Sequence, residues 1–270
     1  MDVYIVNAFT EERFGGNPAA VVPLDAWPGD DDMQAVASQL NLSDTAFFLP
    51  YGDGYAIRWF TPTREAELCG HATLACGHVF FNHLKLTGKT VRLYSKGGTL
   101  EVTGQMNGKI TLDFPAVQST GIQSSDFLES CLRQIPAALY LSPLDYLAVF
   151  ENQSDIEQLH PDFDLLAKVP ARGLIATAPG DSCDFVSRCF YPRSGINEDP
   201  VTGSAHAIMT PYWSARLNKQ VLSARQLSAR KGYLDCEWRE DRVLISGYAR
   251  TFLVGKLTDF LANPSTGRLS

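Results

Sequence analysis

The sequence predicts an α+β protein of two homologous lobes related by a pseudo-twofold axis, because one pattern occurs twice along its 270 residues. In each copy an Arg-x-Phe-x-Pro strand end, at Arg58 and again at Arg188, precedes an acidic loop and a small-residue turn that opens an apolar helix. These copies are 130 residues apart (188 − 58). Two later matches, residues 98–102 with 232–236 and 109–112 with 242–245, follow at offsets of 134 and 133. Chance similarity would not preserve order and spacing together, so both lobes are expected to fold alike.

In the first lobe the apolar pattern predicts mostly antiparallel strands that surround one central helix. Strands are expected at residues 2–9, 19–22, 45–49, 56–60, 91–102 and 109–114. A helix is expected at residues 30–41, because four apolar residues share one face and the acidic residues 30–32 suit a helix N-terminus. The segment 72–84 is apolar around most of its circumference, which indicates a helix buried on nearly all sides.

The second lobe repeats this order. Strands are expected near 138–150, at 173–177, 184–190, 220–228, 232–238 and 242–248, with helices near 154–167 and 204–217. The stretch 116–125 contains Ser, Gln and Gly121, as connecting segments do, so the lobes are expected to span residues 1–115 and 116–270. Clefts between lobes are where small ligands usually bind, and the active site is expected there.

Composition limits the classes of partner. The net charge of −7, without clustered Lys and Arg, argues against nucleic acid and anionic membrane surfaces. A small anionic metabolite stays compatible, because local donors rather than total charge would hold it. The start of the chain resembles a strand without a basic leader, and no run of about 18 apolar residues follows, so a cytoplasmic location is expected.

Cysteine and histidine spacing predicts no metal site. The six cysteines form no C-x-x-C pair and are expected to be buried free thiols, apart from Cys69 in the helix-opening turn. The five histidines lack the spacing that places two ligands on one helical face. His206 falls within the buried helix and is expected to be a core residue. Since no G-x-G-x-x-G loop is present either, we expect activity without metal or cofactor.

The two helix-opening turns, Gly70-His71 and Gly203-Ser204, are the strongest local signal for function. Glycine at the start of a buried helix leaves backbone N–H groups unobstructed, and these donors, with the positive end of the helix dipole, form a site for carboxylate or phosphate. The alternative is purely structural: the glycines permit a tight turn and Ser204 caps the helix. The occurrence of both turns, with Asp199 just upstream of the second, favours a functional site.

Several motifs together resemble the PhzF-like phenazine-biosynthesis isomerase family, over essentially the whole chain. They are Arg13-Phe14-Gly15-Gly16-Asn17-Pro18-Ala19-Ala20-Val21-Val22, Leu42-Ser43-Asp44-Thr45-Ala46-Phe47, Leu68-Cys69-Gly70-His71-Ala72-Thr73-Leu74, Asp199-Pro200-Val201-Thr202-Gly203-Ser204-Ala205-His206 and Gln226-Leu227-Ser228-Ala229-Arg230-Lys231-Gly232. The resemblance implies a diaminopimelate epimerase-like fold, a homodimer, and acid–base isomerisation of a small carboxylate-bearing metabolite without a cofactor.

Site residues carried over from this resemblance fall on both lobes. The resemblance implies catalytic roles for Asp44, His71, Asp199 and Ser204, and a substrate contact for Asn17. The helix-opening turns add Cys69, Gly70 and Gly203 as expected substrate contacts. Asp44 stands where the family's motif has Glu, so its carboxylate is one methylene shorter. A base displaced by about 1 Å costs on the order of a hundredfold in rate unless the pocket closes the gap.

Two other functions stay open on the sequence alone. One is a racemase or epimerase of the same fold, which would use a base from each lobe. Cys69 supplies one thiol, but the matching turn of the second lobe has none, so a symmetric thiol pair is excluded whereas a mixed Cys and Asp pair is not. The other is a non-catalytic protein that binds a small anionic metabolite.

Overall fold

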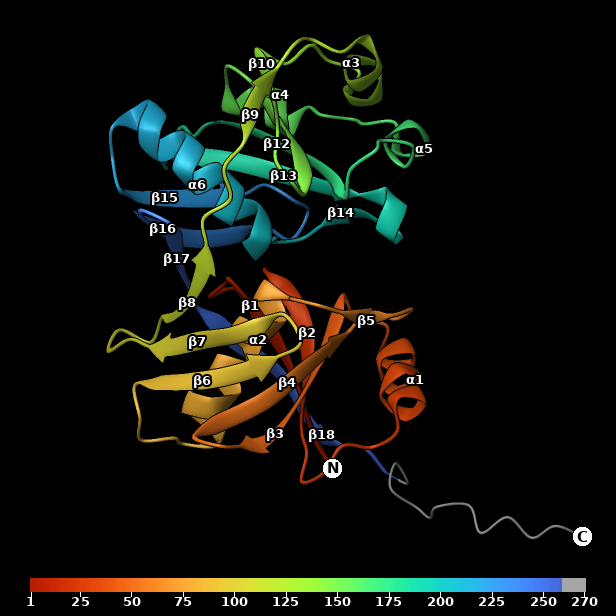
Figure 1. The fold of residues 1–270 in the computed structure, drawn as a ribbon, viewed down its shortest axis with the longest axis vertical. Helices are drawn as coiled ribbons and strands as arrows, with labels where there is room; N and C mark the ends of the chain where they lie inside the picture. The colour runs from red at the N-terminus through yellow and green to blue at the C-terminus, as the bar shows by residue number, and fades with distance from the viewer. Residues whose placement is uncertain (259–270) are drawn as a thin grey trace, which may run out of the picture.

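The computed structural model describes residues 1–258 and consists of two lobes stacked along the long axis of the molecule (Figure 1). The first lobe contains β1 (Asp2–Ala8), β2 (Asn17–Pro23), α1 (Asp30–Leu40), β3 (Asp44–Tyr51), β4 (Gly54–Phe60), β5 (Glu65–Ala66), α2 (Gly70–His78), a π-helical turn η1 (Val79–His83), β6 (Thr90–Ser95), β7 (Gly98–Gly104) and β8 (Ile110–Pro115). The second contains β9 (Thr120–Ile122), α3 (Asp126–Leu132), β10 (Ala138–Leu141), β11 (Asp145–Val149), α4 (Gln153–Glu157), α5 (Phe163–Leu166), β12 (Gly173–Pro179), β13 (Phe185–Tyr191), a 3₁₀ turn η2 (Pro192–Ser194), β14 (Ile196–Asp199), α6 (Gly203–Leu217), β15 (Val221–Gln226), β16 (Gly232–Arg239) and β17 (Arg242–Gly247). The last described strand is β18 (Ala249–Lys256).

The two lobes have the same sheet topology, as the repeat predicts. Neighbouring strands run in the order β18-β1-β2-β3-β4-β6-β7-β8 in the first lobe and β9-β10-β11-β12-β13-β15-β16-β17 in the second. Parallel pairs occupy matching places, β2–β3 with β4–β6 and β11–β12 with β13–β15, and the remaining pairs in these orders are antiparallel. Antiparallel pairing of β8 with β17 joins the lobes.

A strand crosses from each lobe to the other. After β8 the chain enters the second lobe, where β9 pairs with β10, and after β17 it returns to the first, where β18 pairs with β1 (Figure 1). The expected division at residue 116 is therefore too simple for residues 249–256, which belong to the sheet of the first lobe. The sequence pattern predicts no strand at residues 249–256, and the pairing of β18 with β1 joins segments at opposite ends of the described chain.

Each sheet wraps around one central helix. Helix α2 contacts β1, β2, β3, β7, β8 and β18, and α6 contacts β8, β15, β16 and β17. Both helices are buried along most of their length, which explains their nearly uniform apolar character. No helix within residues 1–258 is long and apolar enough to cross a membrane.

The repeated Arg-x-Phe-x-Pro motif forms the same structure twice. Arg58 donates two hydrogen bonds to Glu65, at 2.7 and 2.9 Å, and its guanidinium lies over the Phe60 ring at 5.1 Å. Arg188 does the same with Glu198, at 2.8 and 2.9 Å, over the Phe190 ring at 5.2 Å. Each pair fixes the acidic loop that leads into the central helix.

Two predicted elements of the second lobe are divided. The expected helix at 154–167 is two short helices, α4 and α5, because Pro161 lies between them and Asp162 caps the second by accepting a hydrogen bond from the Leu165 N–H at 3.1 Å. The expected strand near 138–150 is a hairpin of β10 and β11, since the Ser142 hydroxyl accepts from the Asp145 N–H at 2.9 Å and closes the turn.

The two central helices meet at their N-termini, which are both glycines. A Cβ on Gly70 would lie 3.3 Å from the Cα of Gly203, and a Cβ on Gly203 would lie 3.4 Å from the Cα of Gly70. The Phe114 ring packs under both, at 3.4 and 4.0 Å from these Cβ positions. Only glycine allows this approach without displacing a neighbour.

We expect Gly70→Ala and Gly203→Ala each to lower the free energy of unfolding by about 1–3 kcal/mol, as overpacking of a filled contact does. The double variant should lose more than the sum, because both methyl groups press on one contact. Urea unfolding measures this, with Gly88→Ala as control because its nearest neighbour would be 3.6 Å away. Unchanged unfolding midpoints in both single variants would contradict the analysis.

Candidate active site

The site forms where α2 and α6 meet, and each helix leads into it with a different set of side chains. Cys69 is the N-cap of α2 and Thr202 is the N-cap of α6. The first N–H groups of a helix have no partner within it and carry partial positive charge. Two such helix starts in contact place donors for an anion on both walls of one site.

The first lobe contributes a carboxylate, a thiol and an imidazole. Asp44 begins β3, and its Oδ2 lies 3.8 Å from Nε2 of His71, whose Nδ1 lies 3.5 Å from Sγ of Cys69. All three residues are less than a tenth exposed. Oδ1 of Asp44 and Nε2 of His71 have no hydrogen-bond partner among the described residues. Buried polar atoms are nearly always paired in folded proteins, so these two mark a place for polar groups of a ligand.

Burial sets the charge states of this group. It raises the pKa of Asp44 to about 7, with a smaller rise from the charge of Asp199, while contact with the Cys69 thiol offsets part of the rise. It lowers the pKa of His71 to about 3. His71 is therefore neutral near pH 7, and its contact with Asp44 is a dipolar contact rather than an ion pair.

Cys69 lies in the site but is not predisposed to act as a thiolate. Burial raises the pKa of its thiol well above the usual value, and the nearby charge of Asp44 adds to the rise. Ligand atoms of Asp44, Cys69 and His71 lie within 4.8 Å of one another, a set of residue types that zinc also uses. The spacing of cysteines and histidines gave no sign of this set, because its third member, Asp44, lies on β3, well before Cys69 and His71 in the sequence.

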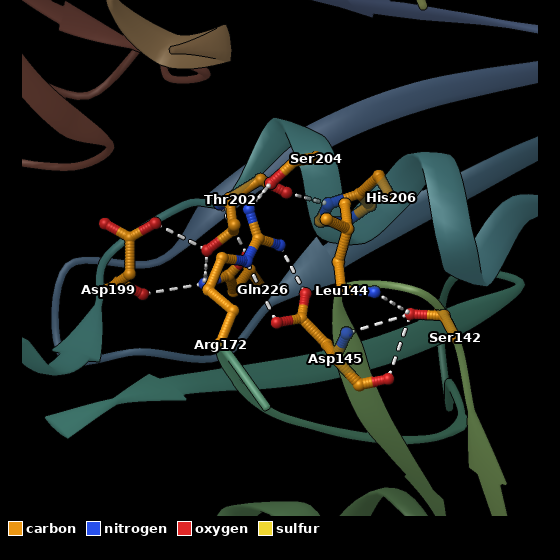
Figure 2. Close-up of polar contacts among 9 residues, drawn as sticks. All are labelled: Ser142, Leu144, Asp145, Arg172, Asp199, Thr202, Ser204, His206 and Gln226. Atoms are coloured by element: carbon orange, nitrogen blue, oxygen red, sulfur yellow. Dashed lines mark hydrogen bonds and ion pairs between the residues drawn. The ribbon is translucent and has the colours of Figure 1, made fainter. Parts of the chain in front are cut away.

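The second lobe contributes Asp199, which is held by several donors. Its Oδ2 accepts a hydrogen bond from the Thr202 hydroxyl at 2.5 Å, and its backbone carbonyl accepts from Gln226 Nε2 at 2.7 Å (Figure 2). Its Oδ1 accepts from Nδ2 of Asn17, in the first lobe, at 2.8 Å. Burial raises the pKa of Asp199 to about 6, and the hydrogen bonds of Thr202 and Asn17 with the charge of Arg172 limit the rise.

Asn17 therefore contacts a site carboxylate across the lobe boundary. It is fully buried, and its amide nitrogen donates to Asp199 and to the Val201 carbonyl, at 2.8 and 3.0 Å. The turn before it is fixed by Arg230, whose guanidinium donates to the carbonyls of Gly15 and Gly16 at 3.0 and 2.7 Å. Asn17 thus positions Asp199, while its Oδ1 has no hydrogen-bond partner among the described residues, so the expected substrate contact stays a prediction.

Ser204, the fourth expected catalytic residue, lies in the first turn of α6, on the side of the helix start away from Asp199 (Figure 2). Its hydroxyl accepts a hydrogen bond from Nη1 of Arg172 at 3.1 Å (Figure 2). Sequence reasoning missed Arg172, Thr202 and Gln226 as site residues. Gln226 and Thr202 lie within the quoted motifs, but Arg172 lies in none of them and only the fold brings it here.

His206 is a core residue, as expected. It is fully buried in α6, where its Nδ1 lies 2.8 Å from the carbonyl of Thr202, and burial lowers its pKa to about 4. It is thus neutral near pH 7.

The lobes repeat the fold but not the chemistry. Strand register places Gly173 of the second lobe where the first has Asp44, since Thr45 pairs with Phe60 as Leu174 pairs with Phe190. A side chain at Gly173 would collide with the Tyr191 ring, 2.2 Å from its Cβ position. Thr202 likewise stands where the first lobe has Cys69. A second thiol is absent from this position, as the sequence indicated.

Comparison with known proteins gives one consistent result. A family model described as phenazine biosynthesis-like protein matches residues 6–255. An uncharacterized isomerase of Pseudomonas aeruginosa is 44% identical over 257 residues, which cover 95% of this chain and 98% of that protein.

Solved structures agree with this relationship. The crystal structure of a phenazine biosynthesis protein of the PhzF family from Enterococcus faecalis has a TM-score of 0.91 and 45% identity, covering 94% of this chain and 97% of that one. A predicted epimerase of Pseudomonas aeruginosa, at 17% identity and a TM-score of 0.74 over 95% of this chain and 99% of its own, shares the fold. The expected diaminopimelate epimerase-like architecture is thus confirmed, and the chain belongs to the PhzF-like family of phenazine biosynthesis-like proteins.

Proposed function

We propose that this isomerase moves a proton between two positions of a small carboxylate-bearing metabolite by acid–base catalysis without a cofactor. The proposal is supported above all by two buried carboxylates, Asp44 and Asp199, which reach one site from different lobes with pKa values raised to about 7 and about 6. A group whose pKa lies near the working pH both accepts and returns a proton efficiently.

In this mechanism Asp44 is the proton carrier. Its carboxylate removes a proton from a carbon next to the substrate carboxylate or within conjugation of it, and the electron pair of that C–H bond moves into the conjugated system. Protonated Asp44 then delivers the proton to a second carbon, which restores the charge of the start. The N–H groups at Gly70-His71 and Gly203-Ser204 stabilise the intermediate negative charge.

The other side chains have supporting roles in this proposal. Neutral His71, with its unpaired Nε2 close to Asp44, exchanges a hydrogen bond with the substrate and orients it. Asp199, held by Thr202 and Asn17, stays more readily ionised than Asp44 and orients a donor group of the substrate.

A racemase or epimerase is the second candidate, because the two acidic groups come from opposite lobes. One carboxylate would take the proton from one face of a carbon and the other would return a proton to the opposite face. The raised pKa of Cys69 argues against its use as one of these bases. A protein that only binds the metabolite is the third candidate. The homodimer and the cytoplasmic location stay predictions.

We expect Asp44→Asn to abolish exchange of substrate hydrogen with solvent while ligand binding stays nearly unchanged, since backbone N–H groups rather than Asp44 hold the carboxylate. Incubation with a mixed extract of small carboxylic acids in deuterium oxide, followed by mass spectrometry, identifies the compound that gains deuterium. Its stereochemistry and double-bond positions then separate isomerisation from epimerisation. Exchange at the wild-type rate in Asp44→Asn would transfer the role to Asp199 or His71.

A matched variant, Cys69→Ser, tests the thiol beside Asp44 in the same assay. If the proton moves through Asp44, this variant keeps most of the exchange activity, whereas a thiol-based epimerase would lose nearly all of it. Circular dichroism of both variants establishes that the fold is intact. Absence of any exchange by the wild-type protein, with a metabolite still bound, would favour the binding protein.

The raised pKa of Asp44 also predicts a pH-dependent stability. The unfolded chain has an Asp pKa of about 3.9, so between about pH 4 and 7 the folded protein holds a proton that the unfolded chain has lost. Stability from protonated Asp44 is complete below that range and is lost as pH rises through about 7. Asp44→Asn should therefore gain stability relative to wild type as pH rises from about 5 to about 8, by on the order of a few kcal/mol. Exposed Asp181→Asn should show no such trend in thermal unfolding; parallel curves for wild type and Asp44→Asn would contradict the analysis.

We further expect exchange activity to survive exhaustive chelation, because the proposed chemistry uses only protein groups. Chelation is an informative test because the ligand atoms of Asp44, Cys69 and His71 lie close enough together to hold a metal ion. Metal analysis of the purified protein accompanies the assay. Loss of activity in EDTA and its recovery with zinc alone would assign the set to a metal and overturn the cofactor-free mechanism.

A further inference from the structure

Arg172 is a charged side chain in the site that the mechanism above leaves unused. It lies just before β12, and its guanidinium lies between the α6 start and β11, next to Ser204 (Figure 2). About a third of its side chain is exposed, at 35%, whereas the side chains of Asp44 and His71 are only 11% and 6% exposed. Arg172 is thus the more accessible charge in a site of buried ones.

The guanidinium is held in one orientation. Its Nε donates to Oδ1 of Asp145 at 2.9 Å, and its Nη2 donates to the other oxygen of the same carboxylate. The Asp145 side chain is fully buried, and the face of the guanidinium lies 5.1 Å from the centre of the Tyr191 ring. A donor fixed by a planar two-point contact and an aromatic face loses little entropy when it binds a ligand.

Donor groups remain available around it. A guanidinium has five N–H groups, and bonds to Asp145 and Ser204 use three of them. Because Ser204 accepts the hydrogen bond from Arg172, its own hydroxyl hydrogen is directed elsewhere. Ser204 also lies in the first turn of α6, where backbone N–H groups are free for a ligand.

These donors also lie close to Asp199, one of the two carboxylates of the proposed mechanism. Arg172 contacts Ser204 in the first turn of α6, whose N-cap residue Thr202 donates to Asp199, and its charge limits the rise that burial causes in the pKa of Asp199. By strand register, the residue of the first lobe that corresponds to Arg172 is Ser43, just as Asp44 corresponds to Gly173. The positive charge therefore occurs in the second lobe alone, and the two helix starts are not equivalent.

We propose that Arg172, with Ser204 and the start of α6, binds the carboxylate of the substrate and makes the enzyme selective for carboxylic acids over their uncharged amides. This inference rests on the proposed function and names the group by which the substrate is held. Arg172 is a specificity-determining residue here: it fixes the end of the substrate that does not react, and so places the reacting carbon against Asp44. Charge-assisted bonds from a guanidinium distinguish a carboxylate from a carboxamide of the same shape.

The test uses benzoate and benzamide, which differ in charge but hardly in shape. Amide chemical shifts in two-dimensional NMR give dissociation constants, and shifts of Gly203 and Ser204 locate the binding. We expect the wild-type protein to bind benzoate more tightly than benzamide, and Arg172→Gln to reduce that preference by about ten- to hundredfold through weaker benzoate binding alone. Arg172→Lys should recover only part of it, since Lys lacks the planar fork.

Removal of Arg172 alone leaves the buried Asp145 without its partner and threatens folding. The double variant Arg172→Gln/Asp145→Asn removes both charges and keeps a hydrogen-bonding pair, so it carries the test if the single variant does not fold. A control, Arg242→Gln/Asp113→Asn, removes another Arg–Asp pair whose arginine is similarly exposed, 38% against 35%, and should leave the benzoate preference unchanged.

The outcomes separate this inference from the proposed function. If the wild-type protein does not prefer benzoate, or if the preference survives the loss of Arg172, the proposal that Arg172 binds the substrate carboxylate is wrong, whatever the exchange assay shows. Conversely, a benzoate preference that depends on Arg172 supports its role in carboxylate binding even if Asp44→Asn keeps full exchange activity. In that case only the assignment of Asp44 as the proton carrier is wrong.

Discussion

The contact between the starts of α2 and α6 is the constraint on which the site depends. Glycines at positions 70 and 203 let the backbones approach to a separation that a single methyl group would disturb. The approach brings together two sets of free N–H groups and two positive helix ends, which is unfavourable for the empty protein and favourable for an anion between them. The sheets, the crossed strands β9 and β18 and the Phe114 ring all serve to hold this arrangement.

Internal duplication supplied the scaffold, and divergence supplied the chemistry. Both lobes keep the same strand order and the same Arg–Glu pair before the helix, because these features fix the helix start. At the helix starts the lobes differ: Thr202 of the second lobe stands where the first has Cys69, and Gly173 stands where the first has Asp44.

Burial explains why these carboxylates suit acid–base work. An exposed Asp is ionised near pH 7 and is too weak a base, whereas removal from water raises the pKa values of Asp44 and Asp199 toward neutrality. Hydrogen bonds then separate the two, since Asp199 accepts from Thr202 and Asn17 while one oxygen of Asp44 has no partner among residues 1–258. The same burial keeps His71 neutral, so it acts as a dipole rather than as a counter-ion.

The sequence by itself determined the duplication, the central buried helices, the two glycine turns and the acidic residues beside them, because each is a local pattern and the duplication is such a pattern repeated in the same order. Tertiary structure decided what those residues contact. Asn17 and Asp199 are 182 positions apart, β18 returns to pair with β1, and Arg172 reaches Ser204 only because β11, β12 and α6 converge. Local patterns report periodicity and turn chemistry, whereas contacts between distant segments follow from how two sheets close around their helices, which no short window of sequence contains.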